Sequence, residues 1–249
     1  MIELQKVTKM FGPVTAIREL SCIFPENRVV GIIGANGSGK TTMMRLISSI
    51  MRPTYGKILV NHIDTTIQSH EIKIEIGFML GGDAVLFPRL TAEENIMFWA
   101  RLQGMNRKEA AERTEELKYA LHMEEFFGRY IDSFSRGMRQ KVLFAQTIVH
   151  SPRILLLDEP STGLDIFSVL EIQKMILSYK KRAGTSILIS SHNMDELENL
   201  CDDILIINQG EKAFFGSKEE LLKEHQTSRI ADAFEKTVVK GMGTYNDAL

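Results

Sequence analysis

A glycine-rich segment near the N-terminus carries the residue types of a phosphate-binding loop. It reads Gly34, Ala35, Asn36, Gly37, Ser38, Gly39, Lys40, Thr41, Thr42 and fits the pattern G-x-x-x-x-G-K-[ST]. Glycines let the backbone turn so that its N–H groups approach a polyphosphate. Lys40 supplies a charge for the β- and γ-phosphate oxygens, Thr41 offers a hydroxyl to Mg²⁺, and Thr42 can donate to a phosphate oxygen. The segment therefore predicts a polyphosphate site.

The flanking residues place this loop between a strand and a helix. Residues 28–33 form a short apolar run with β-branched pairs, which predicts a buried strand. Residues 43–47 predict the helix whose N-terminus faces the phosphates. A chance glycine-rich turn is the alternative, and a full pattern match in this context argues against it.

Acidic residues and a histidine follow two further predicted strands. Asp158 and Glu159 come directly after the apolar run 154–157, and His192 follows the run 185–190. In an open α/β sheet, ligands bind at the carboxyl ends of the strands. Asp158 is then placed to hold Mg²⁺ through a water, and Glu159 to polarise an attacking water. Taken alone, His192 is more often structural, but beside these carboxylates we expect it to contact the γ-phosphate or orient that water.

A second candidate anion site begins at Ser135. This serine is a favourable N-cap for a predicted helix that extends to about residue 149. A helix cap is all that Ser135 need be. With Gly137 beside it, the helix start can also bind an anion. The chain would then hold two phosphate-binding helix starts, on different subdomains.

Composition limits the class of protein. The chain has 249 residues, 44% of them hydrophobic, which is enough for one large α/β domain or two coupled smaller ones. A formal charge of -2 gives no reason to expect nucleic acid as a partner. Cys22 and Cys201 lack metal-ligand spacing, so we expect buried free thiols. With no signal peptide and no apolar run near the ~18 residues that span a bilayer, we expect a cytoplasmic protein that needs another chain for any membrane process.

Strand patterns surround these candidate residues. The expected strands are two over residues 2–24 around Gly12-Pro13, then 55–60, 74–79, 154–157, 185–190 and a hairpin over 204–215. The pattern changes at Thr91, which forms a capping box with Glu94. From there to about residue 150 we expect helices and no strand, as in a helical subdomain inserted into the core.

Helix patterns dominate the C-terminal part of the chain. Residues 165–181 are expected to form an amphipathic helix with Phe167, Leu170 and Ile176 facing inward. Ser217 opens a final helix with a second capping box. Beyond residue 227 the pattern weakens, so a mobile tail is expected there.

Together, the motifs resemble those of an ABC-transporter ATP-binding cassette. The matching segments are the phosphate-binding loop, Ser135–Gln140, Asp158–Asp165 and Ser190–His192, in the order and spacing of that family. The resemblance covers roughly residues 2–225. The Ser-x-Gly-Met-Arg-Gln form of Ser135–Gln140 is most similar to single-cassette subunits of sodium and drug efflux exporters.

This resemblance implies a fold and a domain order. The fold is α/β, a P-loop NTPase core with a mainly parallel sheet, an N-terminal antiparallel β subdomain and an inserted α-helical subdomain. The ATP-binding domain would span residues 1–227, with the helical insertion at about 91–150. Residues 228–249 would follow as the tail.

The resemblance also implies an activity, which is ATP binding and ATP hydrolysis in an ABC exporter. Dimerisation of two cassettes would drive transport through a separate transmembrane permease subunit, with ATP and Mg²⁺ as cofactors. The second cassette would be an identical copy or a related subunit. The chain would then lie on the inner face of the cell membrane, and the membrane subunit would recognise the substrate.

The family's residue roles map onto the candidate positions. Gly34 to Thr42 match the Walker A loop, Phe134 to Met138 the signature, Asp158 the Walker B aspartate, Glu159 the catalytic glutamate, Ser161 to Asp165 the D-loop, His192 the switch histidine, and Phe11 the aromatic that stacks on adenine. Thr41 and Asp158 would hold the metal, and Lys40 would act in catalysis with Glu159 and His192. For Phe11, a core position fits the local sequence equally well.

The signature residues imply a dimer. In the family, Ser135 and Gly137 would contact the γ-phosphate bound to the opposite cassette. Two cassettes would then pair head to tail, with two ATP molecules between them.

Some positions depart from the family pattern. Arg136 stands where a glycine is usual, and Met138 where a glutamine is common. The family also places a glutamine after the strand at 74–79, where it contacts the metal and reports nucleotide state to the membrane subunit. Here none occurs before Gln103, and Asp83 is a candidate replacement.

The surface that faces the membrane subunit is expected around residues 85–88 and 96–99. Apolar side chains in a glycine-rich setting suggest a groove for a partner's helix. For Trp99, a place in the core of the helical subdomain is the alternative.

Two other functions fit parts of the sequence. A non-transport ATP switch acting on ribosomes or DNA would usually carry two cassettes or a long coiled coil, and this chain has one cassette and no heptad run. An ATP sensor without turnover is favoured by the missing glutamine and disfavoured by Glu159 and His192.

Overall fold

A mostly parallel sheet forms the centre of the structure. The computed structural model describes residues 1–67, 69–81, 86–181 and 185–246. Within them the sheet has six strands in the order β10-β9-β3-β8-β7-β6, namely β10 (Glu211–Ser217), β9 (Asp203–Asn208), β3 (Val29–Ile33), β8 (Ser186–Ser190), β7 (Ile154–Asp158) and β6 (Ile76–Met79). All neighbouring pairs are parallel except the hairpin of β9 and β10. The expected strands and hairpin are confirmed, and β6 begins two positions later than the predicted strand.

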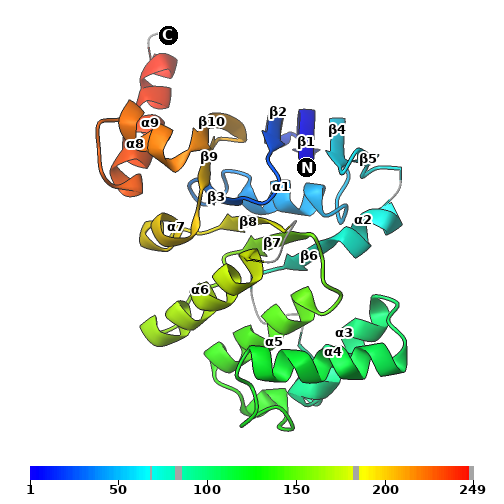
Figure 1. Cartoon of the computed structure of the whole chain (residues 1–249). Coiled ribbons are helices and arrows are strands. Elements are labelled where there is room, and N and C mark those ends of the chain that lie inside the picture. The colour runs from blue at the N-terminus through cyan, green and yellow to red at the C-terminus, as the bar shows by residue number, and fades with distance from the viewer. Residues whose placement is uncertain (68, 82–85, 182–184, 247–249) are drawn as a thin grey trace.

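A smaller antiparallel sheet lies above the central one (Figure 1). Among the described residues it has four strands in the order β2-β1-β4-β5, namely β2 (Val14–Phe24), β1 (Ile2–Phe11), β4 (Tyr55–Val60) and β5 (Ile63–Asp64). Gly12 supports the turn between β1 and β2 with a φ of 57°. The expected N-terminal antiparallel subdomain is confirmed, and the short strand β5 was not predicted.

Helix α1 (Lys40–Ile47) lies between the two sheets (Figure 1). Its apolar residues Met43 and Leu46 share a buried cluster with Leu4 of β1 and with Leu156 and Leu188 of the central sheet. Because both sides of this helix are covered, its N-terminus is held in place by apolar packing. The sheets therefore position the loop that precedes it.

Helices lie on the side of the central sheet opposite to α1 (Figure 1). They are α3 (Ala92–Leu102), α4 (Arg107–Ala120), the 3₁₀ turn η1 (Ile131–Ser133), α5 (Arg136–Ile148) and α6 (Ile166–Lys180). Between residues 91 and 150 the structure has helices, turns and one isolated bridge, as expected for a helical insertion. Thr91 and Asn106 form complete capping boxes at the first two of these helices.

The orientation predicted for α6 is wrong at its N-terminal end. Ile176 is buried as expected, but Phe167 is 82% exposed and Leu170 is 47% exposed. The helix packs on the core through Ile172 and Tyr179, which lie on the face of Ile176. Because α6 carries apolar residues on more than one face, its periodicity does not determine which face is buried.

Other helices correct the expected outline. The predicted strand at 74–79 is in part the end of α2 (Ser69–Glu75). Helix α8 (Lys218–Glu224) begins after Ser217 as predicted, and a short helix, α7 (Met194–Leu200), lies between β8 and β9. Over the described residues, the tail expected at 228–249 contains a helix that was not predicted, α9 (Ile230–Asn246), and its first turn is buried through Ile230. No helix in the described part of the chain has the length and apolar character to cross a membrane.

Candidate nucleotide site

The phosphate-binding loop runs from the end of β3 to the start of α1. Gly39, the residue before α1, has a φ of 110°, and a Cβ there would lie 2.7 Å from the carbonyl oxygen of Ala16. A Cβ on Gly34 would lie 2.4 Å from the carbonyl oxygen of Ile207. Only glycine fits these two positions, because the neighbouring main chain excludes a side chain at both, and the backbone angle of Gly39 disfavours one as well. The packing of the two sheets thus fixes the path of the loop.

Lys40 points its ammonium group into the loop. Its Nζ donates to the carbonyl oxygens of Gly34 at 2.7 Å and Ala35 at 3.3 Å, and the residue is 8% exposed. Among the described residues no ion pair neutralises this charge. An enclosed cation surrounded by main chain at a helix N-terminus favours an anionic ligand.

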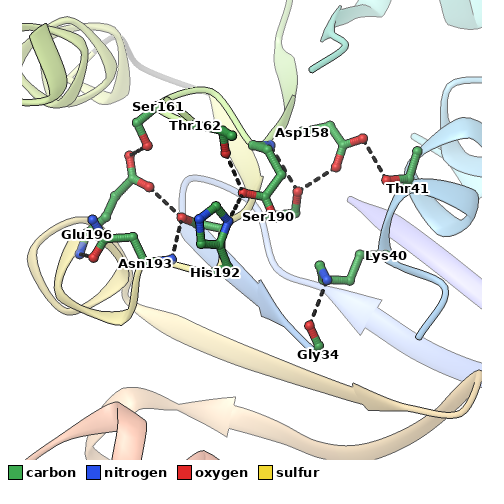
Figure 2. A network of polar contacts seen from close by, with 12 residues as sticks. Gly34, Lys40, Thr41, Asp158, Ser161, Thr162, Ser190, His192, Asn193 and Glu196 are labelled. Carbon is green, nitrogen blue, oxygen red and sulfur yellow. Dashed lines mark hydrogen bonds and ion pairs between the residues drawn. The ribbon is translucent and has the colours of Figure 1, made fainter. Parts of the chain in front are cut away.

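A hydroxyl and a carboxylate meet between the loop and β7. The Thr41 hydroxyl donates to Asp158 Oδ2 at 2.8 Å, and the Ser190 hydroxyl donates to Asp158 Oδ1 at 2.6 Å (Figure 2). Asp158 and Ser190 are paired in register at the carboxyl ends of β7 and β8. Hydroxyl and carboxylate oxygens are the ligands that Mg²⁺ prefers, so Thr41 and Asp158 fit a magnesium ion.

Glu159 and His192 lie in contact beside this pair. His192 Nδ1 lies 2.6 Å from Glu159 Oε2, and the Thr162 hydroxyl donates to the same oxygen at 2.9 Å (Figure 2). Glu159 adopts a φ of 53°, and its backbone N–H donates to both the carbonyl and the hydroxyl oxygens of Ser190, at 3.0 and 3.1 Å. An unusual backbone angle supported by this many contacts is typical of functional sites.

The helix start at Ser135 is built as predicted. Ser135 accepts a hydrogen bond from the backbone N–H of Met138 at 3.2 Å and caps α5. A Cβ on Gly137 would lie 2.5 Å from the Ser168 hydroxyl of α6. No hydrogen bond in the described part of the chain joins this helix start to the phosphate-binding loop. The two predicted anion sites thus belong to separate elements within one chain.

The D-loop (Ser161–Asp165) rests against the start of α5. Gln140 Nε2 donates to the carbonyl oxygen of Pro160, and a Cβ on Gly163 would clash with the Arg136 guanidinium. Gly163 has a φ of 72°, so glycine is favoured at this position by its backbone angle as well as by the lack of space for a side chain. This contact gives the unusual Arg136 a local role, which is packing against the D-loop.

Phe11 ends β1 with its ring 47% exposed. The ammonium of Lys9 lies 5.2 Å from the ring centroid. The alternative prediction that Phe11 is a core residue is therefore wrong. Its ring is partly exposed, as stacking on adenine would require.

The expected membrane-facing surface is described in part. Asp83 and Val85 lie outside the described residues. Phe87 and Phe98 are 43% and 40% exposed and pack edge to face, with ring centroids 4.9 Å apart. Trp99 beside them is only partly buried, so it is neither a fully buried core residue nor a fully exposed surface residue.

A cavity of about 60 Å³ lies next to these aromatic rings, between β6, α3 and α5. Among its lining residues, Trp99 Nε1, Gln146 Oε1 and His150 Nδ1 are buried polar atoms without a hydrogen-bond partner in the described structure. Burial lowers the pKa of His150. Unpaired buried polar groups are costly, so this cavity favours a polar occupant.

Sequence reasoning named Ser190 without giving it a role, and it missed Glu196. Ser190 holds Asp158, and its place in β8 opposite the end of β7 is the signal that identifies it. Glu196 is fully buried in α7 and accepts hydrogen bonds from Ser161 and Ser191. Burial raises the pKa of this carboxyl group, and the hydroxyl groups of the two serines oppose that effect. A glutamate on a helix after His192 gives no local sign of such burial.

Comparisons with known proteins decide the family. Residues 17–162 match the sequence profile of the ABC transporter family. This chain belongs to the ABC transporter family. It is 41% identical over 229 residues to the ABC transporter ATP-binding protein NatA of Bacillus subtilis (strain 168), a match that covers 92% of this chain and 93% of that protein.

Other ABC relatives carry names that refer to different processes. The Linearmycin resistance ATP-binding protein LnrL of Bacillus subtilis (strain 168) is 32% identical over 224 residues, covering 89% of this chain and 70% of that protein. The Fe(3+) ions import ATP-binding protein FbpC of Escherichia coli O157:H7 is 30% identical over 236 residues, covering 94% of this chain and 66% of that protein. Family membership thus leaves the direction of transport to further argument.

A solved ABC cassette shows the same fold in a nucleotide-bound dimer. The post-hydrolysis structure of the ATP-binding cassette MJ0796 bound to ADP and Pi superimposes with a TM-score of 0.79 at 25% identity, covering 87% of this chain and 98% of that one. The present chain is an ATP-binding subunit of an ABC transporter and an ATPase. ATP-binding subunits of this family associate with membrane permease components and dimerise.

Proposed function

We propose that this chain powers an ABC exporter by hydrolysing ATP between two cassettes. The observation that carries the catalytic part is the cluster at the ends of β3, β7 and β8, where Thr41 contacts Asp158 and Glu159 contacts His192. The efflux-type signature of the sequence and the likeness to a linearmycin resistance protein favour export. The likeness to an iron import protein is somewhat weaker at 30% identity.

Each residue in the cluster has one task in this proposal. The residues from Gly34 to Thr42 cradle the phosphates, and the Lys40 ammonium neutralises charge on the β- and γ-phosphates. Thr41 and Asp158 would hold Mg²⁺, which supplies further neutralisation of phosphate charge when bound. Glu159 accepts the proton of the attacking water, and His192 orients that water or the γ-phosphate. Phe11 stacks on the adenine ring.

A second cassette completes the site. Ser135 and Gly137 stand at a helix N-terminus that forms no hydrogen bond with the chain's own phosphate-binding loop among the described residues. We assign them to the γ-phosphate held by the opposite cassette, in a head-to-tail dimer. A helix start delivered in this way supplies N–H donors and a favourable dipole to the phosphate.

The ATPase rate per subunit is expected to rise with protein concentration. A charge-stabilising group supplied in trans is worth ~10³–10⁵ in related phosphoryl transfers, so a dilute monomer should bind ATP but turn it over slowly. Phosphate release measured across a dilution series, with and without the membrane subunit, tests this. A rate per subunit that stays constant down to dilute monomer would contradict the dimeric site.

Mixing two inactive variants gives a sharper version of the same test. Lys40→Ala removes the loop cation, and Ser135→Ala removes the signature hydroxyl, each in one chain. A mixed dimer contains one site with both groups intact, so mixing should restore part of the activity. If the two groups belonged to the same site within one chain, the mixture would stay as inactive as its components.

The exposed start of α6 extends the proposed dimer surface. Ile166 and Phe167 are 77% and 82% exposed, and they follow directly on the D-loop that touches the signature helix. A second cassette seated on Ser135 and Gly137 would therefore also cover these apolar side chains. Burial of such area favours association.

Phe167→Ser is expected to weaken ATP-dependent dimerisation without lowering the melting temperature of the monomer. An exposed phenylalanine contributes little to folding, but about 1.5–3 kcal/mol when it becomes fully buried. Analytical ultracentrifugation with ATP would measure the effect. Tyr119→Ser, which changes a 54% exposed aromatic on α4, serves as the matched control. Equal dimer affinity in both variants would remove Phe167 from the interface.

The membrane subunit is proposed to dock at Phe87, Phe98 and the adjoining cavity. Its occupant would be a helix of that subunit, with a polar side chain reaching Trp99 Nε1 or Gln146 Oε1. Copurification of the native membrane partner would identify the transporter.

A further inference from the structure

Glu196 is a buried carboxyl group that joins two loops of the site. It lies on the first turn of α7 and is fully buried. Its Oε1 accepts the hydroxyl of Ser161 at 2.6 Å, and its Oε2 accepts the hydroxyl of Ser191 at 2.6 Å. Figure 2 shows the side chain reaching Ser161 at the D-loop on one side and the segment before Asn193 on the other. Burying a carboxyl group is costly, so these two short bonds compensate for lost hydration.

The arrangement is not an ordinary helix cap. Asn193 is the N-cap of α7 and accepts from the backbone N–H of Glu196 at 3.2 Å. In a capping box, a glutamate at this position would accept the backbone N–H of the N-cap residue. Here that N–H of Asn193 donates to Ser191 Oγ at 3.1 Å instead. The Glu196 carboxyl group is thereby turned away from its own helix and toward the two serines.

The two serines stand next to the residues assigned to catalysis. Ser161 precedes Thr162, whose hydroxyl donates to Glu159 Oε2. Ser191 precedes His192, which contacts the same oxygen. Glu159 therefore receives one contact from each loop that Glu196 holds. A change in the spacing of the loops would separate these contacts.

We propose that Glu196 is a positioning residue for ATP hydrolysis, because its two oxygens fix the D-loop relative to the switch segment and so align Thr162 and His192 on Glu159. Its side chain is fully buried and its carboxylate binds the two serines, so we assign it an effect through other residues rather than a contact with ATP. The inference rests on the proposed roles of Glu159 and His192. It goes beyond them by naming the group that sets their geometry.

Glu196→Ala is expected to lower kcat while leaving KM for ATP nearly unchanged. Small misplacements of a catalytic group cost up to about 10²-fold, so we expect a loss of roughly 10- to 100-fold in kcat. The phosphate-binding loop is not in contact with Glu196, and loss of kcat alone indicates a contribution made in the transition state. Steady-state phosphate release by the full-length chain, at a concentration where the wild type turns over, provides the measurement.

Two further variants separate positioning from folding. Glu196→Gln should recover most of the rate, since its amide oxygen accepts from one serine and its amide N–H donates to the other. Ser161→Ala should give an intermediate loss, because it removes one of the two bonds and leaves the carboxyl group in place. Hydrogen exchange should show faster exchange of the Thr162 and Leu164 amides in Glu196→Ala, with the exchange of residues 34–42 unchanged.

Several results would overturn the inference. A wild-type kcat in Glu196→Ala would do so. An equally large loss of kcat in Glu196→Gln would also do so, as would a loss of kcat in proportion to the fraction of unfolded protein. Should Glu196→Ala not fold, an unchanged kcat in Ser161→Ala would be decisive. Glu159→Gln serves as the reference. If it hydrolysed ATP normally, the catalytic assignment itself would fail, whereas an inactive Glu159→Gln beside a normal Glu196→Ala would reject this inference alone.

Discussion

Glu159→Gln is expected to bind ATP normally and to lose roughly 10²–10⁴-fold in turnover, the range that a general base supplies. The amide has the size of the carboxylate and can still accept the hydroxyl of Thr162, which now donates to Glu159 Oε2 at 2.9 Å. It cannot take a proton from the attacking water. Lys40 and Thr41 are unchanged, so the affinity for ATP should be retained.

The same variant should accumulate as an ATP-bound dimer, because hydrolysis is the step that reopens the cassettes. Size-exclusion chromatography with ATP and a phosphate-release assay measure both effects. Glu93→Gln is a matched control, since Glu93 is exposed on the first turn of α3 and makes no contact with the site. Normal hydrolysis by Glu159→Gln would assign the catalytic carboxylate to another residue.

Lys40→Ala is expected to lose most of its affinity for ATP. Lys40 is the enclosed cation of the loop, with its Nζ 2.7 Å from the carbonyl oxygen of Gly34 and the residue 8% exposed. Truncating one partner of an enclosed charge pair costs about 2–5 kcal/mol, which corresponds to roughly 30-fold to several-thousand-fold in Kd. The melting temperature without nucleotide should change little, because the ammonium contacts only main-chain carbonyl groups in the described structure.

Equilibrium binding of a fluorescent ATP analogue gives the Kd directly. Lys57→Ala, on an exposed position of β4, controls for the general loss of one positive charge. Thermal unfolding with added ATP gives a second reading, since a ligand that binds the folded state raises its stability. Equal affinity of the Lys40→Ala variant and the wild type would contradict the assignment of the loop as the phosphate site.

Features with a local signal were predicted from the sequence. Strands β3, β7 and β8 are buried at every position, and their central residues appear in the sequence as short apolar runs. The capping boxes at Thr91 and Ser217 need only residues three positions apart. The candidate residues at the strand ends could be predicted because ligands of open α/β sheets bind at the carboxyl ends of the strands.

Features that depend on distant contacts were missed or wrong. Glu196 binds Ser161 at a separation of 35 positions, and nothing near it in the sequence indicates that contact. Phe167 was predicted to face the core because it is apolar. Which face of α6 is buried is instead decided by the face that packs on the core, and Phe167 lies outside it. The tail became α9 because Ile230 is buried by tertiary packing, which a weak local pattern does not reveal.

The contact between the D-loop and the start of α5 has a consequence for a dimer of cassettes. Gln140 donates to Pro160, and Arg136 packs on Gly163, so the helix start assigned to one ATP molecule is joined to the loop that supports the catalytic glutamate of the other. Occupancy of one site would then change the free energy of the second. Such linkage is reciprocal, so each bound ATP would alter the affinity of the opposite site by the same factor. The two sites would act as one coupled unit, with a binding curve that differs from that of independent sites.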